Sequence, residues 1–238
     1  MMENQTKDKI TFKIAFKKLK SSVYYDKTQL ILRNDIVRYE QNSKDKIDSK
    51  LESLCTQFND NNQFKKLQKA IINSISISAF PKKLNKSQTP GVIINKHNSQ
   101  TTVNQNQYFI DMCVEGHILG VVWLMTIGYK LDKLVYEKSY GNRIRKKLIN
   151  ELSDKPTFSP YLFEPYFMQY ESWRDTALDE AKKYLHQKND VMILTMDLKR
   201  YFYSVVVTQN AFDKMLEDAG IDKSDEANCG LVKLNDLM

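Results

Sequence analysis

Apolar residues recur at helical spacing through the first third of the chain, with lysines between them. Five of them share one face of a predicted N-terminal helix: Phe12, Ala15, Phe16, Leu19 and Val23. The run from Ile10 to Phe16 also alternates in polarity, so a strand competes with the helix there. Residues 28–39 and 45–77 carry further mixed helical patterns. This part of the chain is therefore expected to be helical.

The middle of the chain changes from a polar to an apolar stretch. Residues 81–107 are rich in Asn, Gln, Ser and Thr, interrupted by Val92-Ile93-Ile94, and predict a loop or a hairpin excursion. Residues 108–128 are mostly apolar and predict a buried helix that ends at Gly128. His117 lies in this segment, so we expect a core histidine with its hydrogen bonds satisfied rather than a ligand or a base.

The last third predicts a helix, a strand and a second helix. Residues 172–187 place Trp173, Ala177, Ala181 and Tyr184 on one helical face. A predominantly apolar run, Val191 to Met196, then leads directly to a carboxylate, which predicts a buried strand over residues 190–197 with Asp197 at its C-terminal end.

The second helix of this region has clear boundary signals. Thr208 is a suitable N-cap and Gly220 a suitable stop for a helix over residues 208–219. We expect this helix to pack on the same sheet as the predicted strand. The order of elements along the chain predicts an α+β fold with helix in excess.

Charge is unevenly distributed along this chain of 238 residues, which has a net charge of +7. Residues 1–20 hold six lysines against two acids, and residues 129–150 hold seven basic residues against two acids. From Ala211 onward three lysines face seven acids. Clustered positive charge suits a surface that binds a polyanion, although solvated lysines on an exposed face are the competing interpretation.

The spacing of the cysteines and histidines and the length of the apolar runs exclude several classes of protein. The chain has three cysteines and three histidines, all widely spaced, which indicates reduced thiols in a cytosolic protein rather than a disulfide frame or a zinc site. The longest apolar run, Ile118 to Ile127, is shorter than the roughly 20 residues of a membrane span. The polar N-terminus lacks an apolar signal-peptide core. We expect a soluble, cytoplasmic protein without membrane contact.

Asp197 is the first candidate for chemistry. A carboxylate at the end of a buried strand is costly unless something neutralises it, and a divalent cation does so well. Nucleotidyl transfer uses divalent metals held by carboxylates in this way. A strand-ending aspartate that caps the following turn is an equally good interpretation of the spacing alone.

Four segments resemble motifs of bacterial reverse transcriptases, in the family's order, across residues 80–220. Asp197-Leu198-Lys199-Arg200-Tyr201-Phe202-Tyr203-Ser204-Val205 resembles the Asp-Ile-Lys-X-Phe-Phe-X-Ser-Ile segment, which is the first metal-binding motif of the palm. Ser139-Tyr140-Gly141-Asn142-Arg143 is similar to the Ser-X-Gly-X-Arg segment that precedes it. Residues 162–175 resemble the version found in abortive-infection and defence-associated reverse transcriptases. Phe80-Pro81-Lys82-Lys83 resembles the fingers segment that begins with Pro-Lys.

The resemblance implies roles for residues near the incoming nucleotide. Asp197 would coordinate the catalytic magnesium ions, assisted by the carbonyl oxygen of Leu198. Phe202 would abut the incoming sugar and exclude a 2′-hydroxyl, while an ordinary core aromatic remains the alternative. Lys82 and Lys83 of the fingers segment would also lie at the nucleotide.

The resemblance also implies a nucleic-acid contact at a basic cluster. Arg143, together with Arg145, Lys146 and Lys147, would contact phosphate or the template backbone. A solvated basic turn is the alternative. The partners would then be an RNA or DNA template-primer and deoxynucleotides.

By the same resemblance, residues 1–78 would form a helical N-terminal region and residues 79–238 the fingers and partial palm of a right-hand polymerase. The family's second motif, Tyr-X-Asp-Asp, has no counterpart after Val205, because no adjacent Asp-Asp pair occurs there. We therefore expect the complete enzyme to be an RNA-directed DNA polymerase of an antiphage defence system. The isolated chain would be inactive. The missing palm and thumb would either be encoded downstream, as in a split gene or a partial reading frame, or have been lost in a natural truncation.

Two alternatives remain open at this stage. One is a non-catalytic, basic nucleic-acid-binding protein derived from a reverse transcriptase. The other is a helical scaffold without a nucleic-acid role, which requires the motif matches to be accidental.

Overall fold

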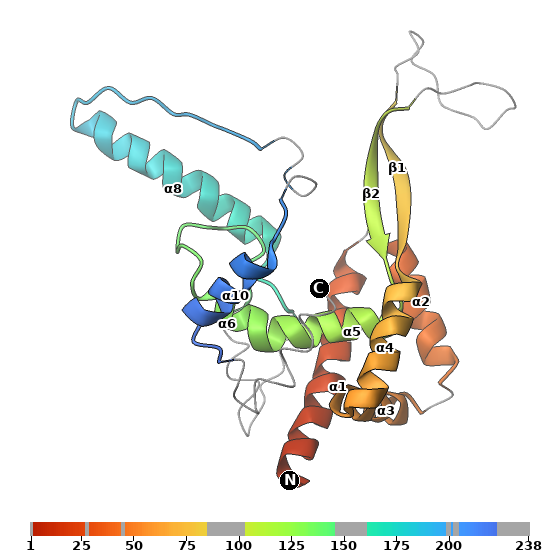
Figure 1. The fold of residues 1–238 in the computed structure, drawn as a ribbon. Coiled ribbons are helices and arrows are strands. Elements are labelled where there is room, and N and C mark those ends of the chain that lie inside the picture. The colour runs from red at the N-terminus through yellow and green to blue at the C-terminus, as the bar shows by residue number, and fades with distance from the viewer. Residues whose placement is uncertain are drawn as a thin grey trace, which may run out of the picture.

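The computed structural model describes residues 2–26, 29–43, 46–84, 103–145, 161–198, 201 and 205–222. Within these ranges helices dominate, and two strands form one small antiparallel sheet (Figure 1). The expected α+β class with helix in excess is confirmed at this level. None of the described helices combines the length and the apolar character needed to cross a membrane.

Four helices form the N-terminal part: α1 (Met2–Tyr25), α2 (Leu30–Gln41), α3 (Ile47–Asn59) and α4 (Asn61–Ser74). The five apolar residues that predicted the first helix are all buried in α1, so the helix and not the competing strand is formed. At the corner between α3 and α4, Asp60 accepts hydrogen bonds from the backbone N–H groups of Asn62 and Gln63. This N-cap starts α4 directly after α3 ends.

A β-hairpin follows α4 and projects away from the helices (Figure 1). Its strands are β1 (Ser76–Leu84) and β2 (Val103–Asp111), with Ser76 opposite Asp111 and Phe80 opposite Gln107. The pairing becomes irregular between Pro81 and Leu84, because proline has no N–H group to donate to the ladder.

The hairpin confirms one of the two predictions for residues 81–107, whose central residues 85–102 lie outside the described part. It also corrects the helix predicted from residue 108. Residues 108–111 belong to β2, where their neighbours on β1 provide backbone partners that a local pattern cannot reveal.

The apolar middle segment forms α5 (Val114–Trp123), the π-helical turn η1 (Leu124–Gly128) and α6 (Tyr129–Asp132). The prediction that Gly128 ends this helix is wrong, because α6 continues from it. A Cβ atom at Gly128 would lie 3.1 Å from the Trp123 ring and 3.2 Å from Leu124 Cδ2. Glycine at this position therefore allows close packing inside the helical segment rather than a stop.

Two further helices are α8 (Tyr166–His186) and α10 (Gln209–Asp218). The helix predicted over 172–187 is confirmed, and it starts six residues earlier. The prediction of α10 is also confirmed: Thr208 Oγ1 accepts from the Ala211 N–H, and Gly220 adopts a positive φ of 66° after its end.

The strand predicted over residues 190–197 is wrong. Residues 191–198 have no strand pairing and run back in the opposite direction to α8 as an extended segment (Figure 1). A strand needs a neighbour, and the two strands of the described residues pair with each other. The expectation that α10 packs on a sheet is wrong for the same reason. Leu216 of α10 instead packs with Ile127 and Leu131 of η1 and α6.

The main core combines α1 to α5 with three residues from farther along the chain, Met125 of η1, Ile144 and Leu162. Lys18, which is buried in α1, donates from Nζ to the carbonyl oxygen of Tyr161 at 3.4 Å. Residues on both sides of the predicted boundary at 78/79 thus share one core. The division into two domains stays a prediction.

Candidate functional site

Asp197 lies near the end of the extended segment 191–198 and is exposed to solvent. Leu198, whose carbonyl was expected to assist it, is 70% exposed. Among the described residues no group of three or more His, Cys, Asp or Glu side chains comes close enough to hold a metal ion. Two-metal transfer needs several carboxylates around the ion pair. The described residues do not by themselves fit such a centre.

The side chains that precede Asp197 are apolar and exposed on both faces of the segment. Met192, Leu194 and Met196 are 89%, 71% and 82% exposed, and Ile193 between them is 60% exposed. Alternate residues of an extended chain point to opposite sides. An extended segment that is apolar on both sides has the composition of a strand from the middle of a covered sheet.

Helix α8 also presents apolar side chains without burying any of its residues. Tyr166, Tyr170 and Trp173 follow one another along the helix, with ring centroids 6.3 Å and 5.7 Å apart. All three rings are at least 48% exposed.

Two of the segments that carry the family resemblance lie side by side. Ile144 forms an isolated antiparallel bridge with Phe163. The Arg145 N–H donates to the Leu162 carbonyl at 3.0 Å, and the Glu164 N–H donates to the Arg143 carbonyl at 2.9 Å. The turn that holds Arg143 is thereby attached to the segment that leads into α8. The hydroxyl of Tyr140, 3.1 Å from Thr176 Oγ1, adds a second link to α8.

Arg143 directs all five of its guanidinium N–H groups inward. Its Nε and Nη2 donate to both carboxylate oxygens of Asp132, at 3.1 Å and 3.3 Å, and Nη2 also donates to the Asp132 carbonyl. Its Nη1 donates to the carbonyls of Tyr136 and Ser139. Arg143 therefore holds the 132–144 turn in shape. A phosphate could bind its guanidinium only by displacing these bonds, so the phosphate contact expected for Arg143 stays a prediction.

Of the other three basic residues of this cluster, the structure describes Arg145. Arg145 lies with Nε 3.9 Å from Glu164 Oε2, and its guanidinium carbon is 5.2 Å from the centre of the Tyr161 ring. Lys146 and Lys147 lie outside the described residues. Lys82 is exposed on β1, whereas the Lys83 side chain and Phe202 also fall outside the described part. Their expected roles stay predictions.

A pocket at the base of the hairpin was not anticipated from the sequence. It has a volume of about 460 Å³ and is lined by the start of α2, by both strands and by His117 of α5. Burial lowers the pKa of His117, and the nearby Asp111 carboxylate opposes this shift. His117 Nε2 lies 3.9 Å from Asp111 Oδ1, which is too long for a hydrogen bond.

His117 Nε2 is buried and has no hydrogen-bond partner in the described structure. The expectation of a fully satisfied core histidine is therefore wrong. In the sequence, the only sign of this pocket is a histidine six residues after an aspartate. This spacing could not be recognised as part of a pocket without knowing where the hairpin lies.

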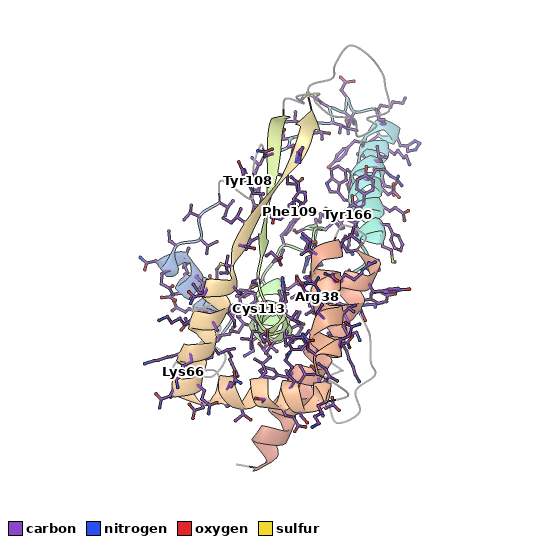
Figure 2. All side chains as sticks on the ribbon, turned by 90° about the vertical axis from the view of Figure 1, so that its right-hand side faces the viewer. Arg38, Lys66, Tyr108, Phe109, Cys113 and Tyr166 are labelled. Carbon is purple, nitrogen blue, oxygen red and sulfur yellow. The ribbon has the colours of Figure 1, made fainter. Side chains whose placement is uncertain are left out.

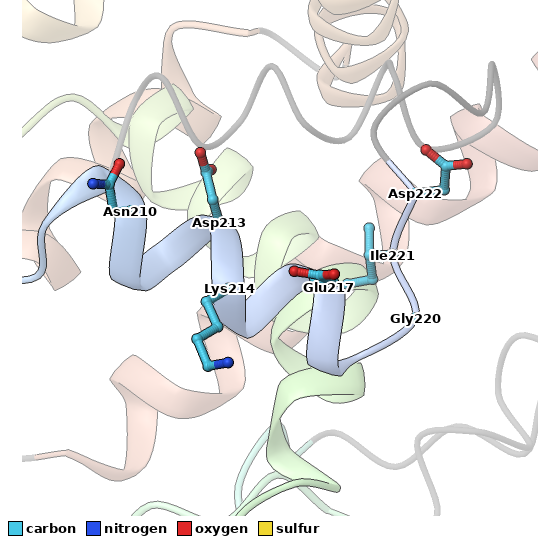
Figure 3. Close-up of a pocket in the computed structure, with 7 residues that line it drawn as sticks. All are labelled: Asn210, Asp213, Lys214, Glu217, Gly220, Ile221 and Asp222. Atoms are coloured by element: carbon cyan, nitrogen blue, oxygen red, sulfur yellow. The ribbon is translucent and has the colours of Figure 1, made fainter.

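A depression of about 780 Å³ lies along α10, and its lining includes Asp213, Lys214, Glu217 and Asp222 (Figure 3). Asp213 accepts a hydrogen bond from Gln209 at 2.9 Å. These acids lie on or after α10 and do not form a Tyr-X-Asp-Asp hairpin tip. In the described part of the chain they form no group able to hold a metal ion.

No family model, curated protein or solved structure matches this chain.

Proposed function

We propose that this chain provides the fingers and the first metal-binding strand of a reverse transcriptase of the antiphage defence type. The complete enzyme would be an RNA-directed DNA polymerase that acts on a template-primer and deoxynucleotides. Asp197 would supply one carboxylate of its magnesium centre, with the Leu198 carbonyl beside it. The motif resemblance across residues 80–220 is the source of this proposal.

One structural observation supports it most. Segment 191–198 is extended, unpaired and apolar on both faces, and it places a carboxylate near its end. These are the properties of a central strand that lacks its neighbours. A second polypeptide segment that adds strands beside it would cover the apolar side chains and bring further carboxylates to Asp197.

The arrangement also explains why the chain alone should not polymerise. Asp197 is the one carboxylate that the resemblance assigns to the metal centre, and a single carboxylate leaves the charge on two metal ions and a triphosphate unbalanced. We expect the purified chain to incorporate no deoxynucleotide on a primed template with magnesium or manganese.

The proposal is tested by primer extension with a complete version that restores the Tyr-X-Asp-Asp segment and the thumb. This version should polymerise, and Asp197→Asn should reduce its rate by several orders of magnitude. Asp190→Asn is the matched control, because Asp190 precedes the same segment and is also exposed. Equal activity of the Asp197→Asn variant and the control would refute the proposal, as would robust synthesis by the short chain alone.

A second candidate is a non-catalytic protein that binds nucleic acid, and the lack of a carboxylate cluster in the described residues favours it. In that case affinity for single-stranded nucleic acid should fall steeply with salt, because bound phosphates release counterions. Replacing Arg145, Lys146 and Lys147 with alanine should flatten the slope by roughly one for each phosphate that the variant no longer binds. Arg143 is left out of this test because its loss would disturb the turn. An unchanged slope would exclude these residues from phosphate binding.

A further inference from the structure

The pocket at the base of the hairpin has an apolar side that is open to solvent. Phe80 and Phe109 meet edge to face across the two strands, with centroids 5.5 Å apart and an interplanar angle of 79°. They remain 44% and 42% exposed, and Leu30 and Ile31 of α2 opposite them are 64% and 49% exposed. Four large apolar side chains thus line a space that no described side chain fills.

Tyr108 and Phe109 are consecutive residues of β2, so their side chains point to opposite sides of the strand. Figure 2 shows Tyr108 and Phe109 on opposite sides of the hairpin. Phe109 lines the pocket and Tyr108 does not. Tyr108 is therefore a matched control for any effect that depends on Phe109.

The polar end of the pocket carries unused hydrogen-bonding groups. His117 Nε2 is buried without a partner in the described structure, a state that costs free energy in a folded protein unless a ligand or water satisfies it. Asp111 Oδ1 accepts from the Met112 N–H at 3.0 Å, and Asp111 Oδ2 has no hydrogen-bond partner within the described residues. A carboxylate acceptor and an imidazole nitrogen therefore lie next to each other at one end of an apolar space.

We propose that this pocket binds a guanine base. The Watson–Crick edge of guanine presents two adjacent N–H donors, N1–H and N2–H₂, which a carboxylate accepts together, and beside them the O6 acceptor. Asp111 would accept from the two donors. A rotation of the neutral His117 ring would bring its Nε2–H, which protein atoms cover in this structure, to O6. The guanine ring would lie against Phe80, Phe109, Leu30 and Ile31, as bases do on aromatic surfaces.

The chemistry of the polar end selects against the other bases. Adenine places an acceptor, N1, where guanine has a donor, so it would face the carboxylate with a lone pair. Cytosine and uracil are smaller and leave part of the apolar side uncovered. The volume of about 460 Å³ is within the range of small-molecule sites.

The guanine could belong to a free nucleotide or to a single strand, and both present the same edge. The pocket shares Phe80 with the segment that resembles the reverse transcriptase fingers, but it includes none of the residues proposed to bind metal, nucleotide or phosphate there, so its test is separate from that proposal. We would titrate the full chain with guanosine, adenosine, cytidine and uridine, which carry no phosphate for surface lysines to bind, and follow binding by calorimetry. The His117 imidazole NMR signals would report the location.

We expect guanosine to bind at least about tenfold more tightly than the other nucleosides, given the discrimination that a bidentate contact provides. Asp111→Asn should remove this preference, and Phe109→Ala should weaken binding of guanosine at least about fivefold. Tyr108→Ala should leave both unchanged, and circular dichroism would verify that each variant is folded.

A second arm compares guanosine with a single-stranded oligonucleotide that contains one guanine among uridines. Equal affinity identifies the free nucleoside as sufficient, and binding of the oligonucleotide alone identifies the strand as the source. Either result supports the pocket if it depends on Asp111. Equal binding of all four nucleosides by the wild type, a guanosine preference that persists in Asp111→Asn, or no binding of either guanine ligand would overturn the proposal.

Discussion

Helices α5 and α8 use apolar residues in opposite ways. Helix α5 buries six of its ten residues, whereas α8 buries none of its 21. Both contain large apolar side chains, so the difference does not come from composition alone. It comes from neighbours: α5 lies among the N-terminal helices, and the apolar stripe of α8 is left uncovered by the described part of the chain.

The same contrast separates two extended regions of the chain. Strands β1 and β2 pair along nearly their whole length, whereas segment 191–198 is unpaired although its side chains are more apolar. A large exposed apolar surface in a folded protein usually marks a place where another polypeptide binds. The comparison therefore separates α5, whose apolar side chains the described part of the chain covers, from residues 166–198, whose apolar side chains it leaves exposed.

The largest expected effect contrasts two leucines of these regions. Leu119→Ala in α5 removes a side chain that is 1% exposed and should reduce the free energy of unfolding by about 2–5 kcal/mol. Leu185→Ala in α8 removes one that is 59% exposed and should change it by no more than about 0.5 kcal/mol. Urea denaturation followed by circular dichroism measures both. Similar losses for the two variants would contradict the contrast between the helices.

A smaller loss is expected at the turn that joins the two regions. Arg143→Ala should cost about 1–3 kcal/mol, because the Asp132 carboxylate loses its charged partner and keeps the Ile144 N–H as a donor, while the Ser139 carbonyl loses the guanidinium donor. Arg174→Ala is the control, since Arg174 pairs with its exposed neighbour Asp175 on α8 and such pairs contribute little. If Arg143→Ala is as harmless as the control, the turn is not held by this network.

The smallest effect concerns pH and His117. Its pKa is lowered in the folded chain, so below about pH 6.5 the unfolded chain binds a proton that the folded chain does not. Stability should therefore fall as the pH drops below 6.5, by at most about 1.4 kcal/mol per pH unit, until the folded pKa is reached. Comparing the wild type with His117→Gln isolates this slope. An identical pH profile in the variant would show that His117 titrates normally.

The sequence predicts those elements whose stabilising interactions are local along the chain. Helices α1, α8 and α10 are recognisable because a helix pairs its own backbone and its caps, such as Thr208 and Gly220, lie within the segment. The strand at 190–197 was predicted wrongly because the sequence pattern records only the apolar side chains and not the presence of a neighbour.

The site residues show the same limit. The position of Asp197 after an apolar run is a local feature and was recognisable. The role of Arg143 in the turn depends on Asp132, eleven residues earlier, and the pocket at His117 depends on α2 and the hairpin meeting. Neither arrangement leaves a spacing that can be recognised in the sequence alone.

Hydrogen exchange monitored by mass spectrometry tests the central contrast most directly. In this chain, backbone amides of residues 191–198 should exchange within seconds, while those of α5 should be protected by several orders of magnitude, because only the latter are hydrogen-bonded and buried. In the complete polymerase that we propose, residues 191–198 should become protected as strands form beside them. Protection of residues 191–198 equal to that of α5 in the short chain, or rapid exchange of this segment in an active complete enzyme, would contradict the account.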